Sequence, residues 1–302
     1  MLRQLGYVAK SFTINAITGR TCRLANATPD KLRSVIAENL ADLERIFQFN
    51  IDQGIGLFRL SSQVIPFASH PINTLAWWDE FAEPLERLKD LSTRHDLRIT
   101  MHPGQYNVLS SPNEKVVTAS IAELQTSARL LDAVHPDATG KMVLHIGGAY
   151  GDRPASLGRF ETVANRLPEA VRRRLVIEND DTIYSTGEAI SLSDSTGLPV
   201  VFDWFHHTLK PSDDPNHARL IARCFASWRP DDGIPKVHLS SQSEEGRSGH
   251  HSDYLDPADF AHFLEVAPDA PFDLMVEAKQ KDLALLQFRE QVGGTAPIGL
   301  KS

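Results

Sequence analysis

Short apolar runs alternate with longer amphipathic stretches along the whole chain. Runs such as MVL at residues 142–144 and LPVVF at residues 198–202 are continuously apolar, which is typical of strands buried on both faces. Eight runs of this kind predict strands, at residues 2–7, 56–60, 97–102, 142–146, 175–178, 199–203, 236–239 and 273–277.

Helix start signals precede several of the intervening stretches. Thr28-Pro29 predicts the start of a helix that runs to about residue 53 and is closed by Gly54. Ser111-Pro112-Asn113-Glu114 has the pattern of a capping box with proline at the first helical position. Asp214-Pro215 and Asp256-Pro257 predict two further helix starts of the same type.

This alternation of strands and helices predicts a parallel sheet, because parallel neighbours need a crossover connection. Eight such units in 302 residues match a (β/α)8 TIM barrel, an α/β fold that commonly takes about 250 residues. We therefore expect one barrel domain over residues 1–291 and a flexible C-terminal tail over residues 292–302. An open doubly wound sheet is the alternative, but no glycine-rich dinucleotide fingerprint follows an early strand.

The composition is that of a globular protein with an acidic balance. A net charge of −8 argues against a basic protein that simply coats phosphates, although bound divalent ions can reverse the local field. No apolar run approaches the roughly 20 residues that span a bilayer, and the first residues lack the apolar core of a signal peptide. Two cysteines make no disulfide framework, so we expect a cytoplasmic protein without a membrane partner. No pattern indicates an oligomer interface, and we expect a monomer.

Polar side chains stand at the ends of six consecutive predicted strands. They are His102, His145, Glu178, Asp203, His238 and Glu277. In a barrel these strand ends meet at one rim, where barrel enzymes carry their active sites. Three carboxylates and three imidazoles at a partly buried rim are costly unless cations neutralise the acids. Mixed His, Asp and Glu ligands suit Zn2+ or Mn2+, so the pattern predicts a divalent metal cluster.

Each of these residues taken singly has a simpler interpretation. A strand-end histidine is commonly a hydrogen-bonded core residue, and a strand-end glutamate can pair with a neighbouring Arg or Lys. The six together favour metal binding. Glu178 is the natural bridging carboxylate, because its strand is central among the six. Of the two histidines that follow Asp203, His206 is slightly favoured over His207 as a further ligand.

Six motifs at these strand ends, in this order, resemble those of the UV damage endonucleases. They are MHPGQY, LHIGGAYGD, IENDD, VFDWFHH, KVHLSSQ and MVEAKQKD. The resemblance extends from Gly6-Tyr7 to Lys279 and leaves out the tail beyond about residue 291. It implies a DNA-repair endonuclease on a TIM barrel, distantly similar to endonuclease IV.

The resemblance implies a cluster of up to three divalent ions, most often Mn2+, with Zn2+ or Co2+ as alternatives. The ligands that it implies are His102, His145, Glu178, Asp203, His206, His238, His251 and Glu277, with His250 as the alternative to His251. It implies catalytic roles for Glu178, Lys236 and His238. Lys236 matches a lysine that can be carbamylated in this family, and an ordinary barrel-mouth lysine is the alternative.

The implied partner is UV-damaged double-stranded DNA, cut immediately 5′ of pyrimidine dimers and 6-4 photoproducts by metal-activated water attack. Abasic sites are a further candidate substrate. Gln105 and Tyr106 would probe the lesion from the stiff Pro103-Gly104 turn, filling space left by unstacked bases; the alternative is that Tyr106 only covers the mouth. His70 and Tyr7 are expected on the same surface.

Basic residues near predicted strand and loop ends are candidates for phosphate contacts, although each is more often a solvated surface charge. They are Arg3, Lys10, Arg20, Arg247, Lys279 and Lys281.

Three other functions remain open from the sequence. A metal-dependent sugar isomerase or epimerase also carries acids and histidines at barrel strand ends, but it would turn over a small sugar. A damaged-DNA binder without activity would have no need of the full ligand set. An abasic-site endonuclease would show little interest in dimers.

Overall fold

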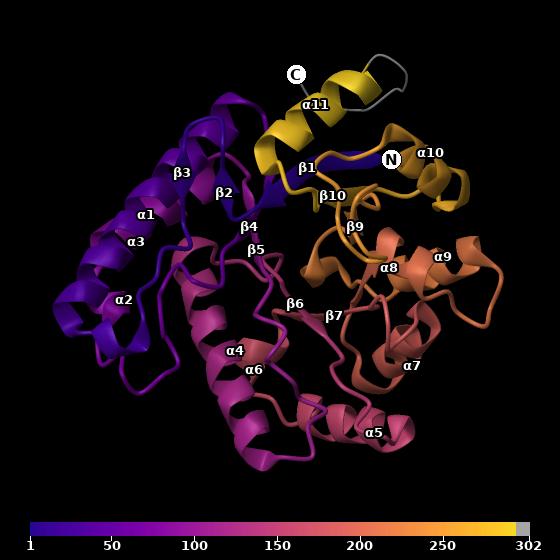
Figure 1. Cartoon of the computed structure of the whole chain (residues 1–302), viewed down its shortest axis with the longest axis horizontal. Coiled ribbons are helices and arrows are strands. Elements are labelled where there is room, and N and C mark those ends of the chain that lie inside the picture. The colour runs from indigo at the N-terminus through magenta and orange to yellow at the C-terminus, as the bar shows by residue number, and fades with distance from the viewer. Residues whose placement is uncertain (294–302) are drawn as a thin grey trace.

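Eight parallel strands close into a barrel at the centre of the molecule (Figure 1). The computed structural model describes residues 1–293. The barrel strands follow one another around the ring in chain order, and β1 closes it by pairing with both β10 and β4. They are β1 (Leu2–Val8), β4 (Leu57–Leu60), β5 (Arg98–Met101), β6 (Met142–His145), β7 (Leu175–Glu178), β8 (Val200–Asp203), β9 (Lys236–Leu239) and β10 (Phe272–Val276).

Helices surround this barrel on the outside (Figure 1). Their bounds are α1 (Pro29–Asp52), α2 (Trp77–Glu80), α3 (Ala82–Arg94), α4 (Glu114–Val134), α5 (Arg153–Ala164), α6 (Glu169–Arg172), α7 (Thr186–Thr196), α8 (Trp204–Leu209), α9 (His217–Ala226), α10 (Pro257–Val266) and α11 (Lys281–Gly293). Short 3-10 turns lie at Leu24–Asn26 and Pro230–Asp232. No helix within residues 1–293 combines the length and apolar character that crossing a membrane requires.

The predicted fold class and all eight barrel strands are confirmed, with each strand end within one residue of the prediction. Continuous apolar runs bounded by turn residues therefore located the strands well. The small antiparallel hairpin of β2 (Lys10–Ser11) and β3 (Ala16–Ile17), which follows β1, was not predicted from the sequence. Helix α11 continues to Gly293, and the rest of the predicted tail lies outside the described residues.

Two of the four predicted helix starts are wrong by a few residues. The starts at Thr28 and Asp256 are confirmed, since both side chains accept a hydrogen bond from a first-turn backbone N–H. Helix α4 begins instead at Glu114, capped by Asn113, and α9 begins at His217, capped by Asn216. In both cases an asparagine follows the proline, and its side chain takes the capping role.

The side chains inside the barrel form layers along its axis. At the end of the barrel where the strands begin, the Arg98 guanidinium pairs with Asp273 at 2.7 Å and lies 5.4 Å from the Trp228 ring centroid. Above it, Val143, Val176 and Val201 pack in one apolar cluster with Trp228. Since strand residues two apart share a face, the next inward positions on β6, β7 and β8 are the strand ends themselves. This apolar layer therefore lies directly beneath the polar residues at the strand ends.

Candidate functional site

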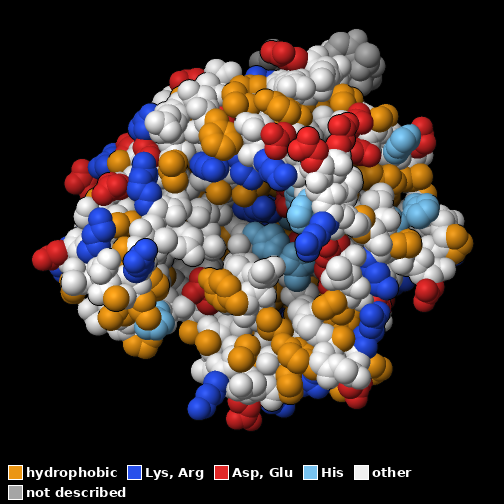
Figure 2. All heavy atoms as spheres, in the orientation of Figure 1, with side chains coloured by type: hydrophobic (Ala, Val, Ile, Leu, Met, Phe, Trp, Pro, Cys, Tyr) orange, Lys and Arg blue, Asp and Glu red, His pale blue; other side chains and the backbone are white. Residues whose placement is uncertain are grey.

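The six strand-end residues singled out in the sequence gather at one mouth, the rim formed by the carboxyl ends of the barrel strands. They form two groups with potential ligand atoms within 4.8 Å of one another: His102, His145 and Glu178, and Glu178, Asp203, His238 and Glu277. Figure 2 shows histidines lining a hollow at the centre of this face. Glu178 belongs to both groups, which agrees with the central position of its strand.

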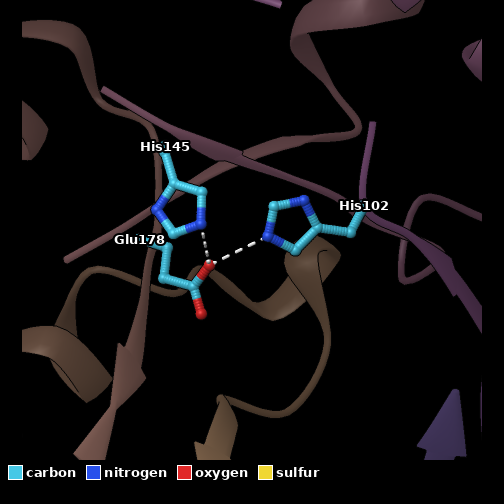
Figure 3. A group of neighbouring side chains, drawn as sticks. All are labelled: His102, His145 and Glu178. Carbon is cyan, nitrogen blue, oxygen red and sulfur yellow. Dashed lines mark hydrogen bonds and ion pairs between the residues drawn. The ribbon is translucent and has the colours of Figure 1, made fainter. Parts of the chain in front are cut away.

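In the first group, two imidazoles face one oxygen of the buried Glu178 carboxylate (Figure 3). Nε2 of His102 lies 3.1 Å from Oε2 of Glu178, and Nε2 of His145 lies 3.4 Å from the same oxygen. The two rings are neighbours, with centroids 5.0 Å apart. Glu178 ends β7, His145 ends β6 and His102 follows β5, so three adjacent strands deliver this group.

In the second group, three acids surround one buried imidazole. Nδ1 of His238 makes a short contact with Oε1 of Glu178 and lies 3.0 Å from Oε1 of Glu277. Asp203 is fully buried, and its Oδ2 atom has no hydrogen-bond partner. Nε2 of His238 is likewise buried without a partner. Buried polar atoms without partners are costly, so this group is chemically incomplete as a set of side chains.

The histidine rings around the mouth are oriented by backbone carbonyls. Nδ1 of His102 lies 3.1 Å from the Pro103 carbonyl oxygen. His206 makes the same contact with Asn179 at 3.0 Å, and His251 with Glu277 at 2.6 Å. A carbonyl only accepts, so each Nδ1 donates its proton, and when the ring is neutral its Nε2 keeps the lone pair. Metal-binding histidines are commonly fixed in this manner.

For His102 this tautomer has a direct electrostatic consequence. Its Nε2 lone pair lies 3.1 Å from a carboxylate oxygen of Glu178, and two electron-rich atoms repel at that distance. A proton or a metal cation between them turns the repulsion into attraction. The donor set, with nitrogen and carboxylate oxygen ligands and no thiolate, fits divalent ions such as Mn2+ or Zn2+.

The structure separates the two adjacent histidine pairs that the sequence left open. The His206 ring lies 5.6 Å from the His145 ring and 6.5 Å from the His251 ring, so both His206 and His251 border the metal-binding groups. His207 is turned away, because its two nitrogens contact Thr186 at 2.9 Å and His217 at 2.7 Å. His250 is exposed in the loop after β9. The geometry therefore favours His206 and His251.

The acids of the mouth have strongly shifted proton affinities in the metal-free chain. Burial and the nearby charges of Glu178 and Glu277 together raise the pKa of the Asp203 carboxyl to about 8, against the opposing effect of His206. Burial lowers the pKa of His206, but the carboxylates around it outweigh burial and raise that pKa to about 9. Crowded carboxylates that draw protons in this way are sites where a cation can neutralise the charge instead.

Lys236 lies inside the barrel on β9, two positions before His238 on the same face of the strand. The side chain is buried, and its Nζ atom has no hydrogen-bond partner. Burial lowers the pKa of this ammonium well below the usual range, and the charges of Arg98 and Arg59 lower it further. Lys236 is therefore poised to be neutral, the state in which an amine is nucleophilic.

The predicted probe residues are exposed beside the first group. Gln105 is exposed, and 61% of Tyr106 is accessible to solvent. The buried Asn107 fixes this turn, since its backbone N–H and its side-chain amide both donate to the Gly104 carbonyl at 2.9 Å. A side chain at position 104 would collide with the Tyr106 ring, which explains the glycine. His70 is also exposed, in the loop after β4.

Tyr7 does not lie on this surface, and its prediction as a DNA-binding residue is corrected. Its side chain is fully buried, and its hydroxyl donates to Oδ1 of Asn50 on α1 at 2.8 Å. The ring packs edge-on against Phe58, with centroids 5.1 Å apart. Residues two apart share a strand face, so Tyr7 points outward to the helix layer while Gly6 and Val8 point to the interior.

Sequence reasoning missed two residues that organise the mouth. Arg59 on β4 forms a largely buried ion pair with Glu277, and 11% of its side chain is exposed. Asn179 joins the ends of β7 and β8, because its side chain exchanges two hydrogen bonds of 2.9 Å with the backbone of Asp203. Arg59 carried a usable signal, as a charged residue inside the apolar run LFRL. For Asn179 the sequence offered only its position after Glu178.

The site can now be compared with known proteins. The family model described as UV-endonuclease UvdE matches residues 3–299. The UV DNA damage endonuclease of Bacillus velezensis is 32% identical over 302 residues, which is 97% of this chain and 94% of the relative. The crystal structure of SacUVDE superposes with a TM-score of 0.88 at 31% identity, covering 97% of this chain and 98% of the other.

A more distant likeness shows the fold alone. Endonuclease IV from Thermus thermophilus superposes with a TM-score of 0.57 at 19% identity, covering 84% of this chain and 95% of the other. The resemblance seen in the strand-end motifs is confirmed by matches that cover nearly the whole chain. The chain therefore belongs to the UV-endonuclease UvdE family and is an endonuclease.

Proposed function

We propose that this chain is a metal-dependent DNA-repair enzyme that cuts the phosphodiester backbone of double-stranded DNA immediately 5′ of UV photoproducts. The observation that carries the proposal is the pair of metal-binding groups that share Glu178, with an exposed aromatic turn beside them. Membership of the UvdE family supports the same activity. Pyrimidine dimers and 6-4 photoproducts are the proposed lesions, with abasic sites as a further substrate.

The proposed metal ligands are the residues of the two groups together with His206 and His251. Bound divalent ions, Mn2+ foremost, would supply the Lewis acidity that activates water and withdraws charge from the phosphodiester. The protein holds its donors ready for them: carbonyls fix the rings of His102, His206 and His251, and the Arg59 ion pair holds the Glu277 carboxylate. Little reorganisation is then needed when the substrate arrives.

We assign Glu178, His238 and Lys236 the catalytic centre of this arrangement. Glu178 and His238 are buried and in contact, and Glu178 bridges the two groups. Lys236 lies beneath them without a hydrogen-bond partner. If its neutral amine adds carbon dioxide and releases a proton, the resulting carbamate would be a fourth acidic group in the centre. The fully buried position protects such a carbamate from water.

Gln105 and Tyr106 are proposed to enter the space left when damaged bases leave the helical stack. A planar phenol on a rigid turn can stack on the neighbouring base and recover part of the unstacking cost. The turn suits this role because Asn107 anchors it from below while both probe side chains remain exposed. His70, on the neighbouring loop, would contact the backbone of the same strand.

The direct test is incision of an oligonucleotide duplex that carries one defined photoproduct, with purified protein and Mn2+. Cleavage at the phosphodiester 5′ of the lesion, mapped on a sequencing gel, is expected. Tyr106→Ala should lower incision about 5- to 150-fold, which corresponds to the roughly 1–3 kcal/mol of one base-stacking contact. Trp78→Ala removes an exposed aromatic on α2 and serves as the matched control.

Different results would redirect the assignment. Equal incision of undamaged DNA would remove the lesion specificity, and cutting only at abasic sites would replace the photoproducts as substrate. Turnover of a ketose sugar with no cutting of any DNA would favour the epimerase alternative. Equal activities of Tyr106→Ala and Trp78→Ala would leave Tyr106 as a cover of the mouth rather than a probe.

A further inference from the structure

Two lysines that are far apart in the sequence are held side by side at one edge of the mouth. Lys10 lies in β2, directly after β1, and Lys281 begins α11. Asp282 joins the two segments: its carboxylate accepts hydrogen bonds from the Ser11 hydroxyl at 2.7 Å and from the backbone N–H groups of Phe12 and Thr13 at 2.7 and 3.0 Å. Each lysine is the direct neighbour of a residue in this contact.

The backbone at Lys281, and at Ala9 directly before Lys10, adopts a left-handed conformation that residues with a side chain rarely take. Lys281 itself has a φ of 52°, and Ala9, which precedes Lys10, has a φ of 69°. Each left-handed residue other than glycine costs free energy, so the surrounding contacts must enforce it. For Ala9 these contacts are a hydrogen bond from its N–H to the Arg59 carbonyl at 2.9 Å and one from the Thr18 hydroxyl to its own carbonyl. Strain of this kind often marks a functional surface.

The two ammonium groups lack acidic partners although both side chains are half-buried. Within residues 1–293 neither has a carboxylate at ion-pair distance; Lys10 has only the Phe12 ring, 4.6 Å from its Nζ. Arg20, another candidate from the sequence, is by contrast neutralised by Asp42 at 2.6 Å. Because neither charge is neutralised by a neighbouring acid, both ammonium groups are available to an anionic ligand.

Arg59 places this cationic edge next to the metal-binding groups. Its guanidinium pairs with Glu277, a member of the second group. Burial lowers the pKa of Lys281, and repulsion from Arg59 and Lys10 lowers it further against the opposing attraction of Glu277. The other two cations and Glu277 are therefore within electrostatic reach of Lys281. In Figure 2, Lys and Arg side chains lie along the upper edge of the hollow that holds the histidines.

The part of the mouth next to this edge, after β8 and β9, has the reverse charge. A cavity of about 860 Å3 between α8 and the loop after β9 is lined by several acids, Glu244, Glu245, Asp253, Asp256 and Asp259 among them, against one lysine, Lys279. A phosphate backbone is repelled from that side and attracted to the edge formed by Lys10 and Lys281. The electrostatic potential therefore changes sign along the mouth, from positive at the lysine edge to negative at the acidic cavity.

We propose that Lys10 and Lys281, with Arg59 behind them, bind a backbone phosphate of the substrate strand next to the phosphodiester that is cut. The inference rests on the proposed function and adds to it the place where the DNA backbone leaves the metal centre. The site selects a phosphate by charge and position and reads no base, so it acts on damaged and undamaged DNA alike.

The test compares Lys10→Gln and Lys281→Asn with the control Lys89→Gln, whose lysine pairs with Glu86 on the surface of α3. Asparagine is chosen at position 281 because it tolerates the left-handed conformation. Binding to an undamaged fluorescent duplex is measured by anisotropy over a series of KCl concentrations. Each mouth variant should weaken binding and reduce the slope of log affinity against log salt concentration by about one, and the double variant by about two. The control should match the wild type.

A second measurement locates the phosphate. Single phosphates around the cut site of a lesion duplex are replaced one at a time by neutral methylphosphonates. At one position the methylphosphonate should lower the affinity of the wild-type protein. The double lysine variant, which has already lost this contact, should bind the modified and the unmodified duplex equally. With the intact lesion duplex, KM should rise in the variants while kcat stays near the wild-type value, because the contact is made equally in substrate and transition state.

The outcomes separate the inference from the proposed function. If the wild type cuts damaged DNA but both lysine variants behave like Lys89→Gln in slope and KM, the phosphate site is refuted and the activity stands. If the wild type neither binds nor cuts damaged DNA, both are refuted. Thermal unfolding checks the folded state, and should Lys281→Asn be unstable, Lys10→Gln alone carries the comparison.

Discussion

Replacing Glu178 by glutamine removes one negative charge from both metal-binding groups at once and leaves the side-chain shape unchanged. The carboxylate is 1% exposed and contacts His102, His145 and His238. We expect Glu178→Gln to fold normally, to lose tight binding of divalent ions and to lose incision of UV-irradiated plasmid. The substitution affects two free energies, that of unfolding the metal-free chain and that of metal binding.

In the metal-free chain, Glu178→Gln should leave the free energy of unfolding nearly unchanged. One contact of Glu178 is a hydrogen bond in the metal-free chain, the short one from Nδ1 of His238, and a hydrogen bond to a charged group contributes roughly 1.5–3 kcal/mol. Against this, the Glu277 carboxylate lies within 4.8 Å and repels Glu178 by about 3–4 kcal/mol at an effective dielectric constant of about 20, while Asp203, with its pKa raised to about 8, is mostly protonated at neutral pH. Gain and loss are of similar size, so unfolding without metal should change by only a few degrees.

Metal binding responds very differently, because a divalent ion interacts with the lost charge twice as strongly as a single charge does. The attraction between a divalent ion and one carboxylate is several kcal/mol. If only about 3 kcal/mol of it is lost, the ion already binds about 100-fold more weakly. Activity should fall about 100- to 1,000-fold or more, as it does when a preorganised electrostatic contact is removed from an active site. Glu86→Gln, which removes an exposed acid on α3, is the matched control.

Three measurements give the result: ion content by elemental analysis after desalting, the shift of Tm on adding Mn2+, and plasmid nicking. Ions at 100 times their dissociation constant stabilise a folded chain by about 2.7 kcal/mol, so wild type and Glu86→Gln should gain several degrees that Glu178→Gln does not. A folded Glu178→Gln protein that retains its ions and nicks plasmid like the wild type would refute the bridging role.

Further expectations follow from other parts of the structure. Treatment with EDTA should abolish incision and lower the Tm of the wild type, with both restored by Mn2+; unchanged activity after complete removal of metal would contradict the assignment of the mouth. Asp282→Ala removes three hydrogen bonds to a buried carboxylate, and it should cost about 3 kcal/mol in a thermal melt, whereas Asp282→Asn should cost less. Burial raises the pKa of the Cys224 thiol, so a thiol reagent should modify Cys22 but not Cys224 in the folded protein and both in urea. Rapid labelling of both in the native state would show that the helix layer opens.

The strand ends were predictable from the sequence because two simple rules act together. Continuous apolar runs fix where a buried parallel strand ends, and barrel closure brings all such ends to one rim. His145, Glu178 and Asp203 could therefore be placed together without knowing any loop. The same rules say nothing about ring tautomers, so His206 and His251 could be chosen over their neighbours only once their contacts with the Asn179 and Glu277 carbonyls were known.

Other features depend on the direction of a side chain or on contacts between distant segments. Tyr7 stands near the end of its strand like the ligands do, but it occupies the alternate face and points to Asn50. A shift of one residue in a strand reverses such an assignment. Lys10 and Lys281 come close because barrel closure places the first strand beside the last. No local sequence pattern predicts this contact.

The net charge of −8 is compatible with a DNA substrate because charge acts locally at this mouth. In the proposed function, bound metal ions would offset the strand-end acids where the phosphodiester is cut. Within residues 1–293, Lys10 and Lys281 have no acidic partner and would supply positive charge along one edge. The acids lining the cavity after β9, next to this edge, repel the backbone from that part of the mouth. Uniform basic charge would hold DNA in any orientation, whereas this uneven field favours the one in which the strand passes over both the lysine edge and Glu178. Acidity elsewhere on the surface weakens non-productive contacts and so adds to the selectivity of the site.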